Sequence, residues 1–174
     1  VGYLHLRQFI NAALTPEDGS PSLTDATTFF KEASVTDLIL DLRYNGGGLL
    51  SVADTVMDLL AGMTATGEPS FKIQVNDQHP EFNDDQDYWG LFDELPDTFS
   101  PIRIAFITSR STASASELVI NGLHPHIDAV MVGGNTFGKQ VGQGRWDMHE
   151  GAEGLERGDC DVALRLTAFE IVNG

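Results

Sequence analysis

The sequence predicts an α/β domain with a largely parallel β-sheet, and three observations support this prediction. Short apolar runs alternate with segments of helical apolar period along most of the chain. The chain has 174 residues and is 41% apolar, which is enough for one core and about one domain. Stretches rich in glycine or serine follow several of the apolar runs. Strand–helix alternation of this kind is typical of α/β folds.

Apolar periodicity places the elements along the chain. We expect strands at residues 2–9, 37–42, 71–75, 102–107 and 128–134. We expect helices at residues 23–33, 49–63 and 114–123. Ser22 and Thr24 are both candidate caps for the first helix. Residues 161–172 close the chain as a strand or a helix.

Two segments interrupt this alternation. Residues 76–100 are polar, acidic and proline-bearing, with interspersed aromatic residues. They form either an exposed excursion or a flap that faces the substrate. Residues 144–160 are rich in glycine and acidic residues, and we expect a loop there. Residues 1–174 otherwise read as a single domain whose abrupt start in a strand indicates a piece of a longer protein.

Composition excludes several classes of function. The chain has 26 acidic and 10 basic residues and a formal net charge of −16, so it repels phosphate backbones and anionic membranes. No apolar run approaches the ~20 residues that span a bilayer, and nothing at the N-terminus looks like a signal peptide. The single Cys160 excludes an internal disulfide framework and a cysteine-based zinc site.

The stretch "GGNTFGKQ" at residues 133–140 matches the core of a phosphate-binding P-loop. A P-loop needs Ser or Thr after its lysine and a helix that follows, but Gln140 stands there. Gly142 and Gly144 come next, which is a poor start for a helix. The sequence therefore argues against nucleotide binding and leaves Lys139 with another role.

A lysine can instead act as a general base that activates a serine. Candidate serines occur in residues 108–123, at the corner where an expected strand runs into an expected helix. Such a corner lifts a side chain above the sheet, and the helix N-terminus supplies free amide donors. The glycines at residues 46–48 leave bare N–H groups of the kind that form an oxyanion hole. A helix cap and a tight turn are the structural alternatives for these two segments.

The neighbours of Lys139 in the sequence suit a base. A lysine titrates near 10.4 in water, so acting near pH 7 requires its pKa to fall by about three units, which burial can achieve. Phe137 and Val141 are apolar, and no acidic residue lies between Val130 and Arg145. Acyl transfer by a serine and a lysine needs no metal ion and no organic cofactor.

His124 and His126 raise two rival interpretations. A metal site at these two histidines is disfavoured, because no Asp, Glu or Cys lies near them at ligand spacing. A Ser–His pair is disfavoured because His124 lies about three turns along the same helix from Ser114. We therefore expect both histidines to be surface residues.

Four motifs occur in order along the chain: "GYLHLRQF", "LDLRYNGGG", "SASE" and "GGNTFGKQVGQ". Together they resemble the C-terminal processing peptidases, also called tail-specific proteases, a serine-protease family that relies on lysine. The resemblance runs from residue 2 to about 143. It implies an α/β fold with a crotonase/ClpP-like core of stacked β-β-α units. It also implies peptide cleavage by a Ser-Lys dyad without a cofactor or metal ion.

The resemblance assigns three catalytic residues by position. Ser114 resembles the nucleophile and lies 25 residues before Lys139, which resembles the general base. Gln143 matches a glutamine that orients the lysine. Ser111 and Ser116 are the competing serines, with capping and loop hydrogen bonding as their alternative roles.

The resemblance also assigns a supporting group of residues. The backbone amides of Ala115 and of Gly47 or Gly48 would form the oxyanion hole. Glu117 and Thr136 match further family positions and are expected to support the site.

Two departures from the family pattern bear on the site. Pro125 stands where several members carry an aspartate, which puts the local geometry in question. Gln140 follows the lysine where glycine is usual, which could restrict the approach of substrate.

The resemblance extends to partners and location. Family members usually carry a PDZ domain before the segment that corresponds to residues 2–9, and bacterial members act in the periplasm or cell envelope on proteins with apolar C-terminal tails. The alternative is a module on the same fold that binds an apolar ligand or a protein without catalysis. Retention of Ser114, Lys139 and Gln143 together favours the enzyme.

Overall fold

The computed structural model describes residues 1–17, 19–75, 78, 80–83, 89–147 and 163–172. Helices and a short 3-10 turn lie at α1 Asn11–Leu14, α2 Leu23–Glu32, α3 Leu50–Ala65, η1 Pro80–Phe82 and α4 Ala115–Leu123. Strands lie at β1 Gly2–His5, β2 Asp37–Asp41, β3 Pro69–Gln74, β4 Trp89–Leu91, β5 Arg103–Thr108, β6 Asp128–Gly133, β7 Val141–Asp147 and β8 Ala163–Val172. The expected strands and helices all occur. The first strand ends at His5, four residues earlier than expected, and the other elements shift by one or two residues at their ends. The structure confirms a mixed α/β fold.

The first sheet has the predicted parallel arrangement. Its four strands lie in the order β1-β2-β5-β6, and each neighbouring pair is parallel. Parallel neighbours require crossover connections, which α2, α3 and α4 provide. Ser22 caps α2 and forms a capping box with Asp25, which decides between the two candidate caps.

A second sheet was not predicted. Its strands lie in the order β4-β3-β8-β7, and every pairing in it is antiparallel. The predicted loop at residues 144–160 was wrong at its start, because β7 runs to Asp147. Glycines hid this strand, yet a Cβ on Gly142 would lie 2.1 Å from the Phe169 ring, so glycine leaves room for that ring to lie over β7.

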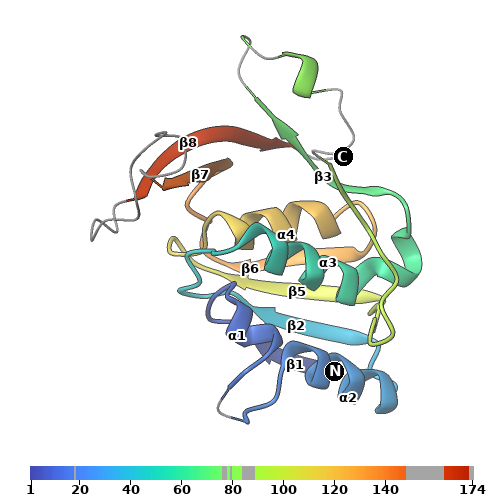
Figure 1. The fold of residues 1–174 in the computed structure, drawn as a ribbon. Helices are drawn as coiled ribbons and strands as arrows, with labels where there is room; N and C mark the ends of the chain where they lie inside the picture. The colour runs from blue at the N-terminus through green and yellow to red at the C-terminus, as the bar shows by residue number, and fades with distance from the viewer. Residues whose placement is uncertain (18, 76–77, 79, 84–88, 148–162, 173–174) are drawn as a thin grey trace.

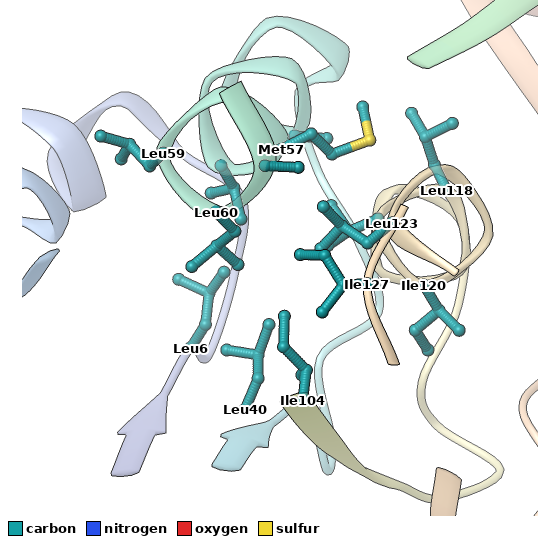
Figure 2. Packing of buried hydrophobic residues seen from close by; sticks show 14 of the residues in the cluster. Leu6, Leu40, Met57, Leu59, Leu60, Ile104, Leu118, Ile120, Leu123 and Ile127 are labelled. Atoms are coloured by element: carbon teal, nitrogen blue, oxygen red, sulfur yellow. The ribbon is translucent and has the colours of Figure 1, made fainter. Parts of the chain in front are cut away.

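The core lies between the parallel sheet and the helices on one of its faces. Figure 2 shows Leu40 and Ile104 pointing from their strands toward Met57 and Leu60 of α3 and Leu123 of α4. Each of these five side chains is at most 1% exposed. Side chains alternate between the two faces of the sheet along β2 and β5, so every second residue packs against the helices. This packing fixes the helices relative to the strand ends.

The loops that follow the parallel strands gather at one edge of the molecule. In Figure 1 the chain leaves β1, β2 and β5 at the side where α1 and the start of α4 lie. Because all strands of this sheet run the same way, their carboxyl ends share that edge. Ligand sites in open α/β sheets occur at such an edge.

Residues 76–100 are only partly an exposed excursion. Phe92 is fully buried, Phe99 is 7% exposed, and β4 pairs with β3, so the end of the segment packs into the domain. Residues 76, 77, 79 and 84–88 lie outside the described residues, as do Cys160 and residues 148–162. Among the described residues, no helix is long and apolar enough to cross a membrane.

Candidate active site

Ser114 occupies a strained turn between β5 and α4. It is the residue before the first turn of α4, with φ 58° and ψ −119°. A non-glycine residue with positive φ is uncommon, and such strain concentrates at functional sites. The turn resembles a nucleophile elbow, in which a sharp strand-to-helix corner exposes a serine hydroxyl.

The structure separates the three competing serines. The Ser116 side chain is fully buried and donates to the backbone carbonyl of Asn45 at 3.0 Å. Ser111 is exposed in the preceding loop, where its N–H donates to the Ser109 hydroxyl. Of the three, only Ser114 lines the cavity at the start of α4. Ser116 is therefore a structural residue.

Asn45 joins the glycine loop to the start of α4, a role that the sequence analysis did not assign. Its buried side chain donates to the Leu6 carbonyl at 2.8 Å and accepts from the Gly47 N–H at 2.9 Å. Its backbone carbonyl accepts from the Ala113 N–H at 3.1 Å as well as from Ser116. The position inside the "LDLRYNGGG" motif was the available signal.

Gly47 and Gly48 lie against different neighbours. A Cβ on Gly47 would come within 2.8 Å of the Ser114 Cβ and 2.9 Å of the Ala115 N, so this glycine touches the serine turn. Its N–H already donates to Asn45 and is not free for an oxyanion. The Phe9 N–H donates to the Gly47 carbonyl, and the Phe9 carbonyl accepts from the Leu49 N–H. These two hydrogen bonds flank Gly48 in a parallel pairing, so the Gly48 N–H points away from Phe9.

Ser114 and Lys139 line one cavity of about 280 Å³. The cavity follows one face of α4, and its lining includes the apolar side chains of Leu118, Met131 and Ile171. Lys139 is half-buried and lies in the loop between β6 and β7. Because β7 is a strand, the lysine is followed by no helix, which agrees with the rejection of the P-loop.

Glu117 connects the serine turn to the lysine loop. Its Oε2 atom accepts from the N–H groups of Ser114 and Lys139, each at 2.8 Å, and its Oε1 atom accepts from the Gly138 N–H at 2.6 Å. The sequence context of Lys139 was therefore misleading, because a carboxylate from another element contacts its backbone. One side chain fixes both predicted catalytic segments.

The environment of Glu117 favours its charged form. Burial raises the pKa of its carboxyl, but hydrogen bonds from the Thr136 side chain and from the N–H groups of Gly138, Ser114 and Lys139 together lower the pKa below its ordinary value of 4.5. Charge-assisted bonds of this kind are stronger than neutral ones. Glu117 and Thr136 both line the cavity of Ser114 and Lys139.

Glu117→Gln is expected to lower the free energy of unfolding at pH 7 by about 1 to 2 kcal/mol, because an amide cannot accept from all of these donors. The folded pKa is lowered, so the stabilisation is complete above the ordinary value of 4.5 and is lost as the pH falls below it. The measurement is urea denaturation from pH 7 to pH 3. The matched control is Glu94→Gln, which removes an exposed carboxylate. Equal effects of the two substitutions would contradict this assignment.

Gln143 does not line the cavity. It is exposed in β7, opposite Thr167 of β8, beside an irregularity in the strand pairing. Gln140 and Ile171 reach the cavity instead, and the Ile171 N–H donates to the Gln140 carbonyl at 2.9 Å. The structure brings Ser114, Glu117, Thr136 and Lys139 together and leaves Gln143 outside this group.

The two histidines differ in position. His126 is half-buried, with its ring 4.8 Å from that of Phe92 in an edge-on arrangement. His124 is exposed and lines the far end of the cavity that begins at Ser114. Among the described residues, no group of His, Cys, Asp and Glu side chains could hold a metal ion.

Comparison with known proteins identifies the family. The profile of Peptidase family S41 matches residues 1–173. The chain belongs to peptidase family S41. A serine-type peptidase is the enzyme class of that family, as the four motifs predicted.

Two curated relatives of this S41 chain are carboxyl-terminal-processing peptidases. The carboxy-terminal-processing protease of Bartonella bacilliformis is 30% identical over 80% of the chain and 29% of its own length. The chloroplastic carboxyl-terminal-processing peptidase 1 of Arabidopsis thaliana is 30% identical over 87% of the chain and 28% of its own length. The chain therefore spans less than a third of the relatives it matches.

A solved structure shares the fold of the S41 chain. The photosystem II D1 C-terminal processing protease superposes with a TM-score of 0.69 and 22% identity, covering 98% of the chain and 37% of that protein. This likeness confirms the mixed α/β arrangement. The finer prediction of stacked, crotonase-like β-β-α units stays a prediction.

Proposed function

We propose that this S41 chain carries the catalytic site of a serine endopeptidase in which Ser114 is the nucleophile and Lys139 the general base. The observation that carries the proposal is the strained Ser114 turn, which shares a cavity with Lys139 and is joined to its loop by Glu117. The oxyanion hole would consist of the N–H groups of Ala115 and Gly48. Ala115 is the first residue of α4, where helix N–H groups lack intrahelical partners.

The proposed reaction is acyl transfer in two steps. Ser114 Oγ attacks the peptide carbonyl carbon while its proton passes to Lys139 Nζ, and the carbonyl oxygen becomes an oxyanion held by the two N–H groups. Collapse breaks the C–N bond, and Lys139 returns the proton to the departing amine. Water then attacks the acyl-enzyme, with Lys139 accepting its proton and passing it back to Ser114. The role of Gln143 in orienting the lysine stays a prediction from the family resemblance, because Gln143 lies outside the cavity in this structure.

Substrate and location follow from the relatives, and they are part of the proposal. Two relatives are named for processing carboxyl termini, so we propose that the protein cleaves other proteins near their C-termini. Apolar tails, a PDZ domain before this segment, and action in the bacterial periplasm or cell envelope stay predictions from the family resemblance. A purely binding module is not favoured by relatives that are named as proteases.

Mass spectrometry of an unstructured test protein incubated with the full-length enzyme tests the proposal. The wild type is expected to cleave it, and Ser114→Ala is expected to reduce the rate by at least about 10⁴-fold, since the attacking hydroxyl is lost. Ser111→Ala is the matched control and is expected to retain cleavage, because Ser111 lies outside the cavity. Cleavage by Ser114→Ala at the wild-type rate would move the chemistry to another residue.

A further inference from the structure

The loop that carries the proposed base from β6 to β7 spans residues 134–140, and we call it the lysine loop. At its start, the Thr108 hydroxyl donates to the Gly134 carbonyl at 2.7 Å, and the Thr108 carbonyl accepts from the Gly134 N–H at 3.1 Å. Further on, the Phe137 N–H donates to the Thr112 carbonyl at 2.9 Å. Together with the bonds to Glu117, these contacts tie the loop to β5, to the turn after it and to α4.

Gln140, the residue after the base, ties the same loop to the second sheet. Its backbone carbonyl accepts from the Ile171 N–H at 2.9 Å, and its side-chain Nε2 donates to the Glu170 carboxylate. Val141, the first residue of β7, is the register partner of Glu170 in β8. Both bonds therefore fall at the point where the loop becomes a strand, directly after Lys139.

This anchor lies at the wall of the candidate active site. Gln140 and Ile171 line the cavity that also contains Ser114 and Lys139, whereas Gln143 does not. Gln140 stands where glycine is usual in the family pattern, and a glycine has no side chain with which to reach the carboxylate of β8. The side-chain bond is thus a feature of this sequence rather than of the motif.

The two bonds act together on the backbone next to the base. The carbonyl of Gln140 and its side-chain amide are both held by β8, which restrains the position of the residue that follows Lys139. A bond from an amide to a carboxylate is charge-assisted and stronger than a neutral one. Because a misplacement of about 1 Å can reduce catalysis by about 10²-fold, restraint at this point bears on the rate.

We propose that Gln140 is a positioning residue for Lys139 and acts through its bonds to Glu170 and Ile171. With Glu117 before the lysine and Gln140 after it, the base is held from α4 and from β8 at once. This inference rests on the proposed function, because it treats Lys139 as the base of the reaction. It assigns Gln140 no contact with the substrate.

Steady-state kinetics of the full-length enzyme test the proposal with four variants: Gln140→Ala, Glu170→Ala, the two combined, and Glu170→Gln. The matched control is Gln74→Ala. Gln74 is an exposed residue of β3 that faces Glu170 in the strand register from the other side, and it does not line the cavity. Thermal unfolding of each variant allows the rates to be referred to the folded fraction.

Gln140→Ala is expected to lower kcat about tenfold and to leave KM within about twofold of its value. Glu170→Ala is expected to lower kcat to a similar extent, and the combined variant no further, since both remove one bond. Glu170→Gln is expected to retain most of the activity because its amide oxygen still accepts from Gln140. Gln74→Ala is expected to change neither constant.

Two results would overturn the inference. A lower melting temperature of Gln140→Ala with an unchanged kcat on the folded fraction would make the anchor purely structural. A raised KM with an unchanged kcat would make Gln140 a contact of the substrate instead.

Hydrogen exchange tests the anchor without cleavage. In full-length protein carrying Ser114→Ala, Gln140→Ala is expected to speed amide exchange in residues 134–140 about tenfold, and Gln74→Ala is expected to leave it unchanged. Unchanged exchange in Gln140→Ala would overturn the inference. Faster exchange combined with an active Ser114→Ala enzyme would keep the anchor and remove the proposed nucleophile. Cleavage that depends on Ser114 but not on Gln140 would keep the peptidase and remove the positioning role.

Discussion

Lys139→Arg is expected to lower kcat/KM for peptide cleavage by about 10³-fold. The substitution keeps a positive charge and a long side chain in the lining of the cavity. An arginine guanidinium cannot lose its proton in a protein, so it cannot accept the proton of the serine hydroxyl. General base catalysis contributes typically 10²- to 10⁴-fold, and that contribution is what the exchange removes.

The control for this prediction is Lys72→Arg. Lys72 lies on β3, outside the cavity of Ser114, with its Nζ atom 4.1 Å from the centre of the Trp89 ring. Arginine makes the same cation–π contact, so this variant is expected to keep both stability and activity. Steady-state kinetics and thermal unfolding of the two variants make the comparison. Retention of more than about a tenth of the activity by Lys139→Arg would rule out the lysine as the base.

Much of the fold could be predicted because its first sheet is built from local patterns. Leu38 and Leu40 lie in a short apolar run and are buried as expected, and Ser22 begins α2 with a capping box. A strand was expected at residues 71–75 and a strand or helix at residues 161–172, but their pairing into a second sheet with β4 and β7 escaped prediction because its signal is not local. Gly142 reads as a loop residue until Phe169 of β8 is placed opposite it.

The same distinction applies to the candidate site. Ser114 and Lys139 were found from motifs in the order of the chain, and the cavity contains both. The roles of Asn45 and Glu117 depend on pairs of segments that meet only in the folded chain. An isolated Glu at the third position of a helix indicates a cap, and nothing nearby in the sequence shows that it also holds the loop around Lys139.

Gly47 is the residue at which the glycine loop contacts the turn that contains Ser114. It has φ 101°, a backbone conformation that L side chains rarely adopt. A Cβ there would lie 2.8 Å from the Ala113 carbonyl oxygen, 2.8 Å from the Ser114 Cβ and 2.9 Å from the Ala115 N. Two of these three are backbone atoms of the residues on either side of Ser114, so they cannot move aside without displacing Ser114.

Gly47→Ala is therefore expected to lower the free energy of unfolding by about 3 kcal/mol and kcat/KM by at least about 10²-fold, because a shift of about 1 Å at the nucleophile is enough for the latter. The matched control is Gly46→Ala, where the added Cβ meets nothing within 4 Å. Denaturant unfolding separates the loss of stability from the loss of rate, which is measured on the folded fraction. If Gly47→Ala matched Gly46→Ala in both measurements, the loop would not constrain Ser114. If only stability fell, the loop would support the fold without positioning the nucleophile.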